Sequence, residues 1–214
     1  MINSLLHIDT TLLSLVAQYG VLTYFILFAI IFAETGLVVT PFLPGDSLLF
    51  AAGSIAARPE GPFKIQALLL LLMLASIFGN KINYLIGRFL GERLFTSNYN
   101  WLFNKRYLQD GHLFYAKHGG KAIVFARFIP IVRTFVPFIA GMSNMNMARF
   151  SFYNIFSAVL WVGALVGAGY CFGTLPFVKN HLSFVIYGIV ILSLSPLIAS
   201  LFFKLRTVLR HGYA

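Results

Sequence analysis

The chain has 214 residues, of which 59% are hydrophobic and only 10% are charged. Soluble domains carry about 25% charged residues, and the mean hydropathy here is +0.83, so the composition excludes a soluble protein and predicts an all-α integral membrane protein. The net charge of +10 does not indicate nucleic-acid binding, because basic residues normally flank membrane spans on the cytoplasmic side and no soluble basic module is present. The single cysteine excludes an internal disulfide.

Four segments are predicted to span the membrane, since a spanning helix needs about 20 mostly apolar residues. They cover about residues 12–33, 65–89, 150–175 and 182–203. The first is interrupted by Gln18 and Gly20, whereas the last two contain no charged residue. The length of the chain therefore suits one polytopic membrane domain over residues 1–214.

Two further apolar stretches, about 34–57 and 122–142, contain prolines and two charges of one sign each. Irregular backbone at membrane depth is tolerated only where protein shields it or where it lines a wet cavity. We therefore expect two re-entrant helical hairpins. The residues expected to break them are Pro41, Pro44 and Gly45 in the first and Pro130 and Pro137 in the second.

The two predicted hairpins share a sequence skeleton: F-x-P, then a charge with a hydroxyl neighbour, then A-G. Residues 91–121 hold five Lys and Arg residues, which places this segment in the cytoplasm. The first hairpin then enters from outside and the second from the cytoplasm, an inverted repeat. Both termini are expected in the cytoplasm.

Aromatic and charged residues alternate in the same 91–121 segment. This pattern is typical of an amphipathic helix lying in the membrane interface, although a solvated loop packed on the bundle fits it as well. His112 and His118 are interpreted as surface residues, because their spacing of six does not place two metal ligands on one helix face.

Four charges fall inside the predicted hairpins: Glu34, Asp46, Arg127 and Arg133. Left unpaired in a bilayer they would cost on the order of 10 kcal/mol. They either neutralise one another as a structural ion-pair cluster, face water, or hold a ligand. All four lie within three residues of a proline or glycine, and broken helix ends create ion sites, which favours a functional role.

The residue types favour an anionic headgroup and protons as ligands. A guanidinium binds phosphate through two parallel hydrogen bonds, so Arg127 and Arg133 are candidates for phosphate binding. Burial favours the protonated form of a carboxylic acid, so Glu34 and Asp46 are candidates for proton exchange. No metal site is expected, because hard cations need more oxygen ligands than two carboxylates supply.

Accessory roles are open for several polar residues near these charges. Asn80, Tyr84 and Arg88 recur every four residues and so share one helix face. For Arg88, snorkelling to the cytoplasmic interface and contact with a ligand remain alternatives. Ser47 and Thr134, the hydroxyl neighbours of two of the charges, complete the candidate set.

The motifs resemble those of the DedA family of bacterial inner-membrane proteins, within the SNARE-associated Golgi protein or VTT group. The matching segments cover nearly the whole chain: ETGL at 34–37, FLPGDS at 42–47, GR at 87–88, KHGG at 117–120 and ARFIPIVRTFVPFIAG at 126–141. One departure is Asn80, since members often have aspartate after the glycine at 79. The resemblance implies functional acids at Glu34 and Asp46 and functional arginines at Arg127 and Arg133.

The resemblance also implies lipid handling in the bacterial inner membrane. We expect a flippase-like transporter of undecaprenyl phosphate or a related anionic phospholipid, coupled to the proton motive force and without a cofactor. The alternative is a proton or ion antiporter. A lipid phosphatase is less favoured, because such an enzyme needs a nucleophile and a general acid within reach, and neither hairpin contains a histidine. An oligomer is compatible with the sequence.

Overall fold

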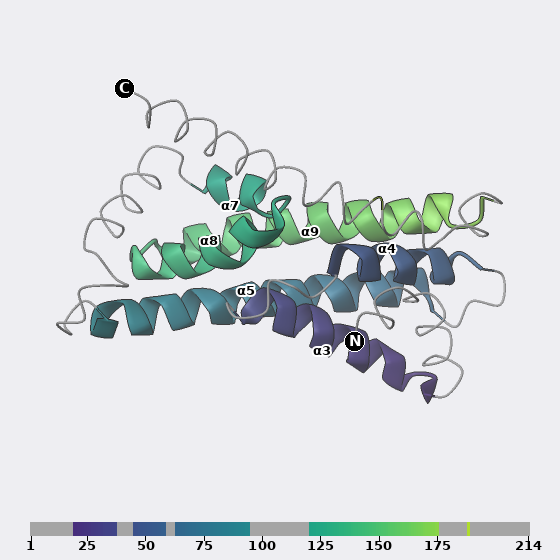
Figure 1. The fold of residues 1–214 in the computed structure, drawn as a ribbon, viewed down its shortest axis with the longest axis horizontal. Helices are drawn as coiled ribbons and strands as arrows, with labels where there is room; N and C mark the ends of the chain where they lie inside the picture. Colours follow the sequence, from purple (N-terminus) through teal and green to yellow (C-terminus); the bar gives the residue numbers. More distant parts are fainter. Residues whose placement is uncertain (1–18, 38–44, 59–62, 95–119, 176–187, 189–214) are drawn as a thin grey trace, which may run out of the picture.

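The computed structural model describes residues 19–37, 45–58, 63–94, 120–175 and 188. Every regular element in these ranges is a helix (Figure 1). The helices are α3 (Leu22–Gly36), α4 (Gly45–Ala56), α5 (Ile65–Leu94), α7 (Lys121–Ala126), α8 (Pro130–Met142) and α9 (Met147–Phe172). Pro41, Pro44, most of the predicted interfacial segment, the first part of the span at 12–33 and nearly all of the span at 182–203 lie outside the described residues.

Two of these helices, α5 and α9, are long and apolar enough to cross a membrane, by length and composition. They confirm the helices predicted at 65–89 and 150–175, although α9 begins and ends three residues earlier. Asn146 sets its start, because the side-chain oxygen accepts hydrogen bonds from the N–H groups of Ala148 and Arg149. Large apolar side chains such as Phe89 on α5 and Phe152 on α9 are about two-thirds exposed, as expected of surfaces that face lipid.

The helices α4 and α8 are short, with 12 and 13 residues. At 1.5 Å per residue each is about 20 Å long, less than the roughly 30 Å of hydrocarbon in a bilayer. Pro130 begins α8 after an extended residue, Ile129, and so separates α8 from α7. The second predicted hairpin is therefore a helix, a break and a second helix, while its re-entrant path stays a prediction.

The prediction was wrong for Pro137, which lies inside α8 without ending it. A proline removes one backbone hydrogen bond and disturbs the preceding turn. The carbonyl that loses its usual donor is that of Arg133, four residues earlier. The adjacent Thr134 carbonyl oxygen accepts a hydrogen bond from the Asn83 side chain at 2.8 Å, so α5 contacts α8 in the turn that the proline disturbs.

The start of the first predicted hairpin was also placed too early. Glu34 belongs to the regular helix α3, which continues to Gly36. The first acid is thus carried by a continuous helix, and the break in the chain comes after it.

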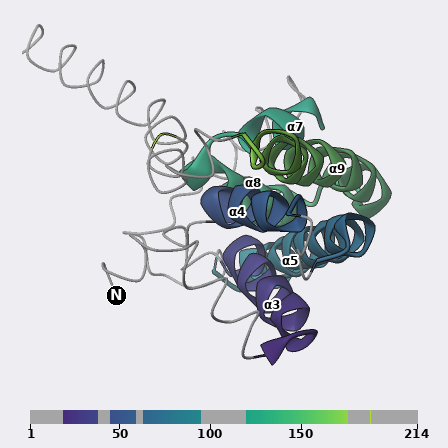
Figure 2. The same cartoon turned by 90° about the vertical axis from the view of Figure 1, so that its right-hand side faces the viewer.

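Each short helix packs on the long helix from the other half of the chain. The most extensive contacts of α4 are with α9, and those of α8 are with α5. Figure 2 views the bundle nearly end-on and shows α4 close to α9. The long helices α5 and α9 also contact each other. This exchange of partners between halves fits the predicted inverted repeat.

Glycines make both of these contacts possible. A Cβ atom at Gly53 on α4 or Gly169 on α9 would lie 2.1–2.2 Å from a backbone carbonyl oxygen of the facing helix. At Gly141 on α8 and Gly87 on α5 the corresponding distances are 2.0–2.1 Å. Gly53 and Gly141 are the glycines of the A-G pairs that the two predicted hairpins share. The A-G pair of each hairpin therefore permits close packing of its short helix on a long helix.

We expect Gly53→Ala and Gly141→Ala each to destabilise the protein by about 1–3 kcal/mol, because the added methyl group must displace a facing backbone. The matched control is Gly167→Ala on α9, where the new Cβ would have no atom within 4 Å and alanine favours the helix. Thermal unfolding in detergent measures the difference. Equal effects at all three positions would contradict this packing.

Candidate functional site: a buried cluster of four charges

The four charged residues predicted from the sequence come together in the structure. Glu34 lies near the end of α3, Asp46 in the first turn of α4, and Arg133 in the first turn of α8. Arg127 lies in the turn that joins α7 and α8. Glu34 is fully buried, and Arg127 and Arg133 are 3% and 8% exposed, so three of the charges are almost completely removed from solvent.

Arg133 is held by both acids. Its Nη1 donates to Asp46 Oδ1 at 2.6 Å, and its Nη2 pairs with Glu34 Oε1. The two guanidinium nitrogens thus connect α8 to α3 and to α4. Because a buried ion left without its partner is strongly destabilising, these contacts fix the mutual positions of three helices.

Gly45 allows α4 to approach the buried acid of α3. A Cβ atom at this position would lie 1.7 Å from Glu34 Oε2, so any other side chain would collide with the carboxylate. Gly45 is the first residue of α4, and the positive end of the helix dipole therefore faces the carboxylate. The sequence marked Gly45 as a helix breaker, and the structure adds that this site needs a residue without a side chain.

Arg127 is bound differently from Arg133. Its Nη1 donates to Ser157 Oγ at 3.1 Å and to Asn154 Oδ1 at 3.3 Å, and both partners are neutral residues of α9. Among the residues that the structure describes, Nη2 has no hydrogen-bond partner. Within the described ranges, Arg127 makes no ion pair with a carboxylate. Sequence reasoning did not distinguish the two arginines. Among the described residues, Arg133 is paired directly with carboxylates and Arg127 is not.

The contribution of α9 to the site was not predicted from the sequence. Trp161 is 2% exposed, and its indole N–H donates to Asp46 Oδ1 at 2.9 Å. Asn154, Ser157 and Trp161 follow the spacing i, i+3, i+7 and so share one helix face. That spacing was the available signal, but the absence of charged residues made this segment resemble a plain span.

The accessory candidates divide into buried and exposed groups. Asn80 and Tyr84 are buried; Asn80 Nδ2 donates to Asn154 Oδ1 at 3.0 Å, and the Tyr84 hydroxyl donates to the Met145 carbonyl oxygen. Arg88 is exposed, and its Nη1 donates to the Tyr84 hydroxyl at 3.4 Å. Ser47 and Thr134 are both buried.

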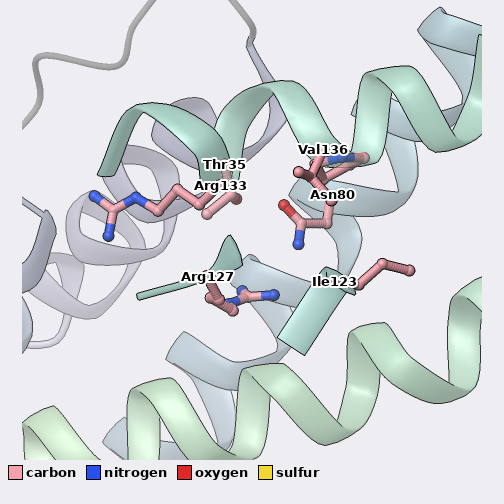
Figure 3. Close-up of a pocket in the computed structure, with 7 residues that line it drawn as sticks. Thr35, Asn80, Ile123, Arg127, Arg133 and Val136 are labelled. Carbon is pink, nitrogen blue, oxygen red and sulfur yellow. The ribbon is translucent and has the colours of Figure 1, made fainter. Parts of the chain in front are cut away.

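A small cavity lies beside the two arginines (Figure 3). Its volume of about 10 Å³ is enough for about one water molecule. A phosphate group does not fit in this state without movement of the surrounding helices. The lining residues are Thr35, Asn80, Ile123, Arg127, Arg133, Val136 and Pro137.

The cluster does not resemble a metal site. The described part of the chain contains no group of three or more His, Cys, Asp or Glu residues placed to hold a metal ion. The two carboxylates that do lie close together are both engaged by Arg133. The cluster instead combines two carboxylates with two guanidinium groups, and guanidinium is the side-chain group best suited to bind an anion.

We expect Arg133→Gln to cost about 3–5 kcal/mol of stability, because two carboxylates lose their shared cation. Arg127→Gln loses only hydrogen bonds to neutral groups and should cost about 1–2 kcal/mol. The loss of unfolding free energy in Arg133→Gln, relative to the parental protein, should become smaller as the pH is lowered, since protonation removes the uncompensated negative charge. The loss in Arg127→Gln should stay nearly the same. Unfolding curves in detergent between pH 5 and 8 measure both effects. Equal costs with the same pH response would contradict the difference between the two arginines.

Known proteins resemble this chain over most of its length. The VTT domain matches residues 43–171. "Protein DedA" of Escherichia coli (strain K12) is 50% identical over 196 residues, covering 92% of this chain and 90% of the relative. "Inner membrane protein YqjA" of the same organism is 42% identical over 153 residues, covering 72% and 69%.

A mycobacterial relative extends the comparison. "Uncharacterized membrane protein ML0287" of Mycobacterium leprae (strain TN) is 39% identical over 184 residues, covering 86% of this chain and 78% of the relative. No solved structure matches the chain. The domain match, the identity to these relatives and the apolar helices together show that this chain is a membrane protein of the DedA family, with a VTT domain.

Proposed function

We propose that this protein moves an anionic lipid with a phosphate headgroup across the bacterial inner membrane, and that proton binding to Glu34 and Asp46 drives the movement. Undecaprenyl phosphate or a related phospholipid is the proposed substrate. The observation that carries the proposal is Arg127: a buried guanidinium with one free nitrogen and no carboxylate in contact among the described residues.

Arg127 has the chemistry of a headgroup ligand. Burying an ion is costly unless a partner of opposite charge is near, and no described residue of the closed site gives Nη2 a hydrogen-bond partner. A phosphate oxygen would supply both the charge and the acceptor. The hydrocarbon tail would stay in the bilayer, against the exposed apolar side chains of the bundle.

The acids give the site a response to protons. With both carboxylates ionised, the four charges of the cluster sum to zero. Each bound proton adds one positive charge and weakens a contact that holds Arg133. Proton uptake would therefore strengthen the attraction for a phosphate and allow Arg133 to bind it beside Arg127.

Movement of the short helices would open the cavity. The helices α4 and α8 carry Asp46 and Arg133 and pack on long helices from the opposite halves of the chain. In an inverted repeat, two such units can rock so that a central site faces each side of the membrane in turn. We include the re-entrant hairpins and cytoplasmic termini in this proposal.

The alternative is a proton or ion antiporter. Its support is the direct contact of two acids with one arginine, which would exchange protons without any lipid. We propose a transporter and not an enzyme, because the cluster combines binding groups without a nucleophile activated by a base.

The test is lipid movement in liposomes that contain the purified protein and fluorescent undecaprenyl phosphate. Arg127→Gln should slow translocation about 10–100-fold, as expected for loss of hydrogen bonds to a charged group, and Arg127→Lys should recover only part of the rate. The matched control is Arg149→Gln at the exposed start of α9, which should keep the parental rate.

Two results would overturn parts of this function. Translocation that is independent of Arg127 would exclude the headgroup site, and translocation insensitive to a pH gradient would exclude proton coupling. Proton flux of equal size in liposomes with and without the labelled lipid would favour the antiporter.

A further inference from the structure

Asn154 on α9 connects Arg127 to the long helix α5. Its side-chain oxygen accepts hydrogen bonds from Arg127 Nη1 at 3.3 Å and from Asn80 Nδ2 at 3.0 Å. Its side-chain nitrogen donates to the Ile77 carbonyl oxygen at 3.0 Å. The side chain of Asn154 is buried, so three hydrogen bonds hold it where solvent does not reach. One amide therefore ties the guanidinium of Arg127 to two residues of α5.

The chemistry of its partners fixes the orientation of this amide. A guanidinium can only donate hydrogen bonds, and a backbone carbonyl can only accept them. The oxygen of Asn154 must therefore face Arg127, and the nitrogen must face Ile77. Because Ile77 lies within the regular helix α5, its carbonyl is a fixed reference point. Arg127 thus meets an acceptor whose position is set by the fold.

The other contacts that the structure describes between Arg127 and α9 are also uncharged. Ser157 Oγ accepts from Arg127 Nη1 at 3.1 Å. The guanidinium carbon lies 5.1 Å from the centre of the Trp161 ring, and the guanidinium carbon of Arg133 lies 5.0 Å from the same ring. Both distances are within the range of cation–π contacts. These contacts orient Arg127 without cancelling its charge.

The residue type at position 154 decides whether that charge is kept. Aspartate has nearly the size and shape of asparagine, and a carboxylate binds a guanidinium more strongly than an amide does. An acid at this position would therefore neutralise Arg127 within the protein. Asparagine holds the guanidinium by a weaker contact and leaves its positive charge for a ligand.

We propose that Asn154 is a positioning residue that makes the site selective for anionic over neutral lipid headgroups. This inference rests on the proposed function. Its amide holds Arg127 at the cavity that Arg127 and Asn80 both line (Figure 3). Because the amide carries no charge, the guanidinium keeps its full attraction for a phosphate.

Two prenyl lipids that differ only in the phosphate group test this assignment. The dissociation constants of farnesyl phosphate and of uncharged farnesol would be measured by calorimetry with the purified protein in a nonionic detergent. Asn154→Asp should weaken binding of farnesyl phosphate about tenfold or more, because a carboxylate repels the phosphate, and should leave farnesol binding unchanged. Unchanged affinity for farnesyl phosphate, or equal losses for both lipids, would overturn the inference.

The matched control is Asn146→Asp, the same substitution at the N-cap of α9. Aspartate caps a helix about as well as asparagine does, so this variant should bind both lipids like the parental protein. A loss of farnesyl phosphate binding as large as that in Asn154→Asp would show that any added acid has this effect, and would overturn the inference.

A second variant removes the acceptor without adding a charge, since aspartate at 154 also lacks the donor for the Ile77 carbonyl. Asn154→Ala should weaken farnesyl phosphate binding about threefold, as expected for loss of one hydrogen bond. Arg127→Gln should then have a smaller effect on this affinity in Asn154→Ala than in the parental protein, because the arginine is no longer held. Equal effects of Arg127→Gln in both backgrounds would overturn the inference.

Translocation in liposomes separates this inference from the proposed function. If the parental protein does not move fluorescent undecaprenyl phosphate, but farnesyl phosphate binding depends on residue 154 as expected, transport is rejected and the role of Asn154 stands. If the parental protein moves the lipid, and Asn154→Asp moves it as fast as Asn146→Asp, the role of Asn154 is rejected and transport stands.

Discussion

The structure depends on how an apolar bundle accommodates four charges, three of which are almost completely buried. A single charge at membrane depth costs several kcal/mol if it has no partner. Arg133 meets this constraint for both acids, since its two terminal nitrogens contact Glu34 and Asp46. Those contacts join α3, α4 and α8, and Gly45 at the start of α4 is the position that permits the close approach to Glu34. The fold around the site therefore follows from the pairing of Arg133.

The remaining charge, Arg127, is the one that the proposed function assigns to the lipid headgroup. Arg127 is buried among neutral partners on α9, and one of its nitrogens has no hydrogen bond to any part of the chain that the structure describes. A cluster designed only to close the fold would pair each arginine with an acid. Here both acids are assigned to one arginine, and this unequal division favours a site that accepts an anion over an ion-pair cluster with a purely structural role.

Sequence reasoning identified the helices at 65–89 and 150–175 and the four charged residues, because apolar length and charges out of place are visible in a linear chain. It did not separate Arg127 from Arg133, since their partners lie on α3, α4 and α9 and the choice depends on packing. Pro137 was expected to break the helix, but α8 continues through it and packs along α5, where Asn83 contacts the preceding turn, and a linear sequence does not show such contacts between helices. It overlooked Trp161 because a neutral aromatic residue within a span is ordinarily part of the packing, and only contacts across the bundle give it another role.

Paired substitutions show whether Glu34 neutralises Arg133 and not Arg127. The unfolding temperature in detergent would be measured for Arg133→Gln and Arg127→Gln, each alone and each combined with Glu34→Gln. We expect Glu34→Gln to restore much of the stability lost in Arg133→Gln, because the double variant no longer buries that unpaired carboxylate. We expect no such recovery for Arg127→Gln. Recovery of both variants to the same extent, or of Arg127→Gln alone, would show that Glu34 does not pair selectively with Arg133.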